Sequence, residues 1–83
     1  DNSIIIDCTF DKQETLENAI KRIQNESEIS VRKGLTHLIL SDKGVAENRL
    51  AIPMLLSVGA INTHLIKNKL RGYASINAQT GEA

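Results

Sequence analysis

The sequence predicts a small α/β fold, in which three strands alternate with two helices around a small parallel sheet. Two isoleucine- and leucine-rich runs, residues 3–8 and 36–40, are each followed by a longer stretch with helical patterning, residues 12–33 and 53–71. A third strand candidate, residues 73–78, closes the chain. This β-α-β-α-β order is typical of parallel strands joined by right-handed crossovers.

The first strand and the first helix follow from local patterns. Residues 3–8 contain three consecutive isoleucines, and β-branched side chains favour strands. Asp11 and Glu14 have the spacing of a capping box, and Gly34 suits a helix C-terminus. Between them, apolar or small side chains recur at three- and four-residue steps and predict one buried stripe. Its members are Leu16, Ala19, Ile20, Ile23, Ser27 and Val31.

The second strand and helix are more apolar than the first pair. Residues 36–40 lack polar alternation apart from His37, which indicates a strand covered on both faces. Pro53 fits the first turn of a helix, and Gly72 fits its C-terminal cap. We expect six side chains to lie against the sheet or a partner surface, and Leu56 or Met54 to be exposed. The six are Leu55, Val58, Gly59, Ile61, Leu65 and Ile66.

Length and charge limit the classes of protein to which the chain could belong. Its 83 residues carry ten Lys and Arg against ten Asp and Glu, so charge gives no argument for nucleic acid or for a membrane surface. No apolar run approaches the ~20 residues that span a bilayer. A single cysteine fits a reducing compartment. The chain begins and ends next to strands and lacks an initiator Met, so residues 1–83 are expected to be one truncated piece of a larger α/β domain. Such a piece is expected to self-associate through its exposed apolar surface.

Side chains with possible chemistry lie where the predicted strands end, at residues 7–9, 41–44 and 79–82. Asp7 and Asp42 could form a carboxylate pair, although capping of loops or helices is the commoner role of Asp. Cys8 lacks a neighbouring His and is expected to be a buried, inert thiol. Residues 41–44 lack the glycine spacing of a phosphate loop, and neither His37 nor His64 has a partner at metal-ligand spacing. The residues themselves therefore indicate no catalytic, cofactor-binding or metal site.

The connection of residues 41–51 is long for a strand-to-helix loop, where about 2–6 residues are usual. Extra length at the carboxyl edge of a parallel sheet indicates contact with something else. We expect Asp42, Lys43 and Arg49 to be exposed polar contacts to another domain, whose charge reversal would leave the stability of the chain nearly unchanged.

Four blocks of this sequence resemble the central domain of the glutamate synthase large subunit. They are IDCTF at 6–10, LILSDKGV at 38–45, IPMLLSVGAINTHLI at 52–66 and GEA at 81–83. The family usually has several His before Leu65, where this chain keeps His64, and a Glu where this chain has Gln79.

The resemblance implies the parent enzyme's activity, cofactors and partners. Glutamate synthase forms two L-glutamates from L-glutamine and 2-oxoglutarate, using an amidotransferase domain and an FMN-binding barrel with an iron–sulfur cluster. The central domain lies between them, helps to enclose the ammonia route and carries no catalytic residue. The chain is thus expected to be a non-catalytic scaffold segment of a cytoplasmic oxidoreductase, without a cofactor of its own. An independent flavodoxin-like module that binds an anion at its strand-end loops is the alternative.

Overall fold

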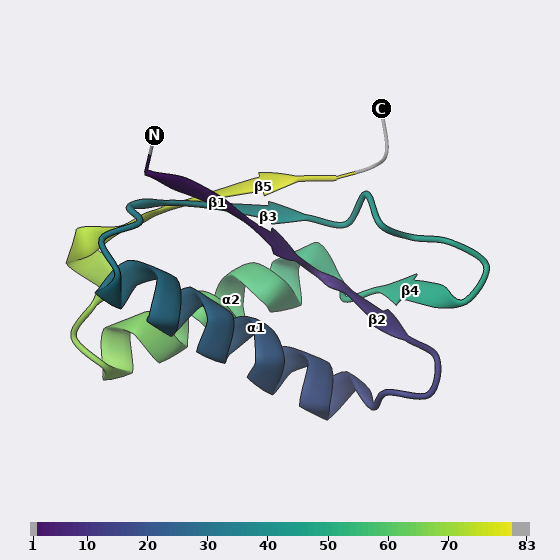
Figure 1. Ribbon diagram of the computed structural model, residues 1–83. Coiled ribbons are helices and arrows are strands. Elements are labelled where there is room, and N and C mark those ends of the chain that lie inside the picture. The colour runs from purple at the N-terminus through teal and green to yellow at the C-terminus, as the bar shows by residue number, and fades with distance from the viewer. Residues whose placement is uncertain (1, 81–83) are drawn as a thin grey trace.

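A computed structural model describes residues 2–80. Its elements are β1 (Ser3–Asp7), β2 (Thr9–Asp11), α1 (Leu16–Arg32), β3 (His37–Ser41), β4 (Arg49–Ala51), α2 (Met54–Lys67), the 3₁₀ helix η1 (Arg71–Tyr73) and β5 (Ser75–Gln79). β1, β3 and β5 form a parallel sheet in that order, which confirms the predicted α/β class (Figure 1). The block at 81–83 lies outside the described residues.

Both helices cover the same face of the sheet (Figure 1). The strand order advances in one direction, so two crossovers of the same hand bring both helices to one side. The core lies between this face and the helices. Its fully buried apolar side chains are Ile6, Cys8, Ala19, Ile23, Leu38, Leu40, Ile52, Ile61 and Leu65.

The opposite face of the sheet is uncovered within the described chain. In β3, Leu38 and Leu40 point to the helices and are buried, whereas the alternate residues His37 and Ile39 are exposed and half-buried. On the neighbouring strand, Ile5 leaves 67% of its surface exposed. The prediction that both faces of β3 are covered is therefore wrong for this chain. A strand with apolar side chains on its uncovered face has the same sequence pattern as a strand that is buried on both faces.

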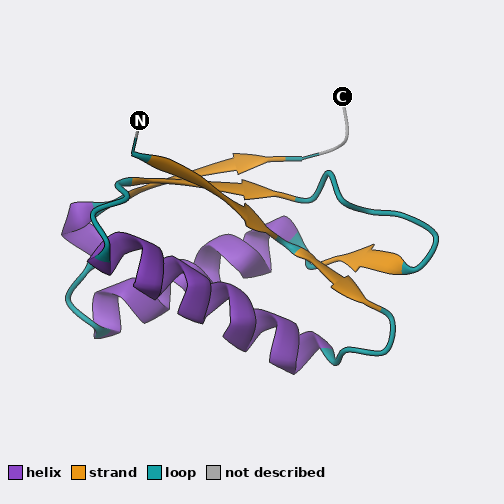
Figure 2. Cartoon of the chain, in the orientation of Figure 1, coloured by secondary structure: helices purple, strands orange, loops and turns teal. Residues whose placement is uncertain are grey.

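A second, antiparallel ribbon was not predicted. β2 pairs with β4, placing Thr9 opposite Ala51 and Asp11 opposite Arg49 (Figure 2). The Ile52 N–H donates to the Cys8 carbonyl at 2.8 Å and continues the pairing toward β1. The last residues of the connection after β3 thus form β4, which pairs with β2, so the predicted loop does not extend to residue 51.

The first helix begins later than the expected residue 12. Thr15 is its N-cap, and its Oγ1 accepts a hydrogen bond from the Asn18 N–H at 3.1 Å. Asp11 instead belongs to β2, and its carboxylate accepts the Gln13 N–H at 2.8 Å in the following turn. The predicted capping box is therefore wrong, because a turn intervenes. Gly34 closes the helix as expected, with φ of 93°.

The second helix ends at Lys67, four residues before the predicted boundary. Lys69 adopts the left-handed conformation with φ of 61°, and the Leu70 N–H donates to the Leu65 carbonyl at 2.8 Å. This is the pattern of a Schellman closure, with a lysine where glycine is usual. Gly72 lies in η1 and is not the cap.

Half of the expected α2 contacts form. Ile61 and Leu65 are buried and Val58 is half-buried, but Leu55 is 90% exposed. Gly59 and Ile66 also face away from the core, and a Cβ on Gly59 would meet no atom within 4 Å. These residues do not pack on the sheet, because the sheet occupies only one side of α2.

Gly59 therefore allows a test of packing against helix propensity. Gly59→Ala should raise the free energy of unfolding by up to about 1 kcal/mol, since the added methyl enters open space and restricts the unfolded backbone. Urea denaturation of the chain measures this change. A loss of stability in Gly59→Ala would show that another surface already packs on α2.

Candidate functional site

The groups at the carboxyl edge of the sheet meet as the sequence predicts. Asp7, Ser41 and Gln79 lie in one row across β1, β3 and β5. The Cys8 N–H donates to the Ser41 carbonyl at 2.8 Å, and the Asp42 N–H donates to the Gln79 carbonyl at 3.3 Å. Of the predicted group 79–82, residues 81 and 82 lie outside the described residues.

Asp7 caps the bend between β1 and β2. Its Oδ1 accepts the Thr9 N–H at 3.0 Å and the Thr9 hydroxyl at 2.6 Å. This carboxylate has the loop-capping role that the sequence favoured over a catalytic pair with Asp42.

Two arginines converge on Thr9, which is fully buried. Arg49 Nε donates to Thr9 Oγ1 at 2.9 Å. Arg49 Nη2 donates to the Thr9 carbonyl at 3.0 Å and lies 3.7 Å from Asp7 Oδ2. Arg22 Nη2 donates to the same carbonyl at 2.6 Å, and its Nη1 to the Asp7 carbonyl at 3.1 Å. No sequence pattern pointed to Arg22 as a member of this junction, and Arg49 is bonded within the chain rather than free on the surface.

The connection of residues 42–48 is folded against this junction. A Cβ on Gly44 would lie 3.2 Å from Thr9 Oγ1, so glycine permits the close approach. The Lys43 N–H donates to Ser41 Oγ at 3.2 Å, and the Ala46 N–H donates to the Arg49 carbonyl at 3.2 Å. These N–H groups are paired within the chain, whereas an anion cradle would need them free. Asp42 is half-buried and Lys43 is exposed.

Cys8 has the surroundings of a structural thiol. It is fully buried, and burial raises the pKa of its thiol, which opposes formation of a thiolate. Its Sγ lies 3.6 Å from the Ile6 carbonyl. Residues 2–80 contain no group of three His, Cys, Asp or Glu side chains that could hold a metal ion.

The two histidines have partners that lie far away in sequence. His64 Nε2 and Glu28 Oε1 are 2.7 Å apart and join α2 to α1, while Arg32 Nε donates to Glu28 Oε2 at 2.9 Å. The hydrogen bonds from His64 and then Arg32 lower the pKa of Glu28. His37 Nδ1 contacts Ser75 Oγ at 2.9 Å across β3 and β5.

The broadest candidate site is the uncovered sheet surface, which we call the open face. Ile5, Ile39 and Asn77 form its central row, and His37 and Ser75 lie in the next row. Parallel sheets are normally covered on both faces. The central row therefore combines the exposed Ile5 and the half-buried Ile39 with the polar Asn77, on a face that no element of residues 2–80 covers.

A three-stranded parallel sheet covered by two helices on one face defines a small α/β unit. The match to a known family agrees with this class. All of residues 1–83 match the family model of the glutamate synthase central domain. The chain therefore belongs to the glutamate synthase central domain family.

Curated relatives support the same assignment. The chain is 44% identical to the glutamate synthase (NADPH) large chain of Azospirillum brasilense, over 99% of this chain and 6% of that protein. It is 49% identical to the chloroplastic ferredoxin-dependent glutamate synthase of Oryza sativa subsp. japonica, over 82% of this chain and 4% of that protein. The corresponding values for the Bacillus subtilis (strain 168) large chain are 41%, 94% and 5%. The chain thus spans a small part of these relatives.

Neither helix in residues 2–80 combines the length and the apolar character needed to cross a membrane.

Arg49 should stabilise the chain, contrary to the expectation that its charge is dispensable. Arg49→Met removes the charged hydrogen bonds to Thr9, so we expect the free energy of unfolding to fall by about 1–2 kcal/mol. The loss would be larger for a fully buried arginine, but the Arg49 side chain is partly exposed to solvent. The matched control Lys43→Met, at an exposed side chain, should change it by about 0.5 kcal/mol or less. Equal effects in urea denaturation would contradict a stabilising role for Arg49.

The Glu28 carboxylate should make the chain less stable in acid. Its pKa in the folded chain lies below the ordinary value of 4.5, so its contribution is present above that pH and is lost as pH falls through the lowered pKa. Glu28→Gln should therefore destabilise the chain at about pH 7, and this effect should shrink steadily as the pH falls from the ordinary pKa through the lowered one. Thermal unfolding over a series of acidic pH values measures this, and an effect independent of pH would exclude the ionised carboxylate as its cause.

Proposed function

We propose that this chain is a non-catalytic scaffold segment of a glutamate synthase, seated between an amidotransferase domain and an FMN-binding domain of the same polypeptide. In this role it helps to enclose the route of ammonia from L-glutamine to 2-oxoglutarate. The observation that carries the proposal is the open face, which leaves Ile5 exposed in a chain that spans 4–6% of its curated relatives.

The polar groups of the carboxyl edge also support a scaffold role. Asp7, Thr9, Arg22 and Arg49 are bonded to one another or to backbone carbonyls, which makes a rigid edge. The half-buried Asp42 and the exposed Lys43 follow β3 at this edge, and they are the proposed polar contacts to a neighbouring domain. Arg49 would act indirectly, by fixing the connection that carries them.

The flavodoxin-like alternative is less well supported. An anion site at the strand ends would need free backbone N–H groups or a free cationic side chain. Several N–H groups of the connection are paired within it, and both arginines of the edge donate to Thr9. Lys43 is exposed, but the Lys43 N–H itself donates to Ser41 Oγ, so side chain and backbone do not form an anion site together.

FMN and an iron–sulfur cluster belong, in this proposal, to other domains of the parent protein. The cytoplasm is the proposed compartment for a parent with one reduced cysteine in this segment.

The parent enzyme provides the test. Ile5→Lys would place a charge on the open face and should increase the ammonia released to solvent per glutamate formed, because domain packing would loosen. Ile5→Val keeps an apolar β-branched side chain there and should preserve coupling. Asp42→Lys tests the connection in the same assay.

The stability of the variants separates packing from misfolding. Because Ile5 is largely exposed, Ile5→Lys should unfold at nearly the same urea concentration as the unmodified chain in isolation. Tight coupling of ammonia transfer in both Ile5→Lys and Asp42→Lys parents would argue against this segment as an enclosing scaffold.

A further inference from the structure

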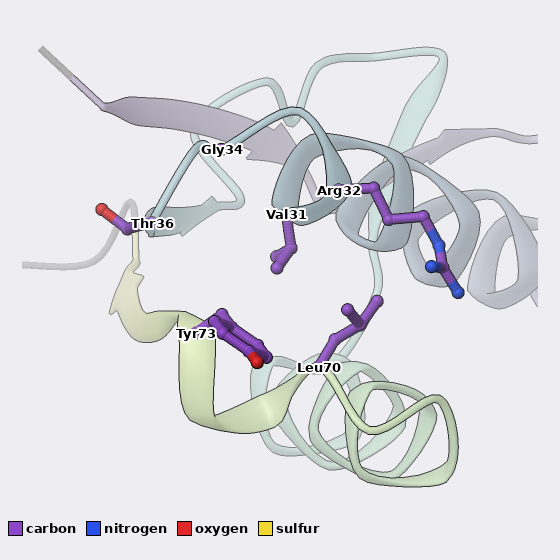
Figure 3. Close-up of a pocket in the computed structure, with 6 residues that line it drawn as sticks. All are labelled: Val31, Arg32, Gly34, Thr36, Leu70 and Tyr73. Atoms are coloured by element: carbon purple, nitrogen blue, oxygen red, sulfur yellow. The ribbon is translucent and has the colours of Figure 1, made fainter.

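A hollow lies at the end of the molecule opposite the carboxyl edge of the sheet. It has a volume of about 470 Å³ and is lined by Val31, Arg32, Gly34, Thr36, Leu70 and Tyr73. Val31, Leu70 and Tyr73 point toward one another across it, while the ends of Arg32 and Thr36 extend away from its centre (Figure 3). The floor is therefore apolar and the rim is polar.

The same end of the chain concentrates positive charge. Both helices end there, followed by η1 (Figure 1). We call the five cationic residues at these ends the basic pole. They are Arg32, Lys33, Lys67, Lys69 and Arg71, half of the ten Lys and Arg of the chain. The Glu28 carboxylate nearby is already bonded to Arg32 and His64.

Helix dipoles explain part of this charge. Arg32 and Lys67 occupy the last turns of α1 and α2, where cations are favourable. Lys69 and Arg71 come after the end of α2 and are outside that explanation. Within residues 2–80, no carboxylate forms an ion pair with Lys33, Lys67 or Lys69, all of which are exposed.

Arg71, which lies in sequence between Leu70 and Tyr73 of the hollow, is fixed in position by hydrogen bonds. Arg71 Nε donates to Asn62 Oδ1 at 2.6 Å, and its Nη1 donates to the Ala74 carbonyl at 2.6 Å. Tyr73 follows in the same 3₁₀ turn and leaves 68% of its surface exposed beside the hollow. Tyr and Arg are both enriched among the residues that anchor protein interfaces.

We propose that the basic pole and the hollow together are the docking site of an acidic segment of the parent polypeptide. One apolar side chain of that segment enters between Val31, Leu70 and Tyr73, and carboxylates on either side of it pair with Lys33 and Lys69. The inference rests on the proposed function, because it assigns the occupant to the same chain. The matched region covers 4–6% of the curated relatives, so the rest of the polypeptide can supply such a segment.

Charge and shape give the site different tasks. The cations select an acidic segment and speed its approach, and the apolar hollow fixes its register. An acidic segment lacking an apolar side chain would leave the Tyr73 ring exposed, and an apolar segment lacking carboxylates would leave the lysines unpaired.

Lysine acetylation of the full-length parent tests the proposal. A lysine paired with a carboxylate must leave it before reacting, so Lys33 and Lys69 should react about tenfold more slowly in the native parent than in parent unfolded by urea. Tyr73→Ser should restore fast acetylation of Lys33, while the matched variant Tyr73→Phe keeps the ring and should leave it slow. Carbodiimide cross-linking should join Lys33 or Lys69 to an Asp or Glu outside residues 1–83.

Three results would overturn the proposal. The first is fast acetylation of Lys33 and Lys69 in the native parent. The second is slow acetylation that persists in Tyr73→Ser. The third is a cross-link from Lys33 or Lys69 of an unlabelled parent to a ¹⁵N-labelled parent, which would show that a second copy occupies the site. Ammonia coupling in Ile5→Lys is measured separately, so failure of the scaffold proposal at the open face is distinguishable from failure here.

Discussion

The parallel order β1-β3-β5 of the three-stranded sheet is the constraint on which the rest of the structure depends. Two crossovers of one hand must place α1 and α2 on the same face, so one core forms and the other face stays open. The outer side of α2 is exposed for the same reason, because no layer lies beyond it. The open face and the exposed Leu55 are thus two results of one topology.

Thr9 joins the two sheets of the molecule. Its carbonyl accepts from Arg22 of α1 and Arg49 of β4, and its side chain bridges Asp7 and Arg49. Helix, ribbon and strand end are therefore fixed to one buried residue. This network includes Asp7, a predicted candidate for chemistry, and Arg49, a predicted contact to another domain, so both side chains have structural partners within the chain.

The sequence predicts those features that depend on short-range patterning. Two isoleucine- and leucine-rich runs located β1 and β3, a 3.6-residue stripe located α1, and an apolar stretch between Pro53 and Gly72 located α2. The ribbon of β2 and β4 was missed because three-residue strands are too short to show a period. The pair Glu28 and His64 was missed because its partners are 36 residues apart and meet through helix packing. One-sided cover of β3 was missed because its uncovered face is itself partly apolar.

The parallel pairing has a consequence for how the chain reaches its native state. His37 and Ser75, which face each other on β3 and β5, are 38 residues apart, and Thr9 and Arg49 are 40 apart. Such distant partners slow folding relative to helical chains of similar size. During synthesis the isoleucine-rich β1 leaves the ribosome well before β3 exists to pair with it. The apolar strand β1 is therefore unpaired and exposed for a time during synthesis. At that stage we expect the chain to depend on chaperones or on rapid formation of α1.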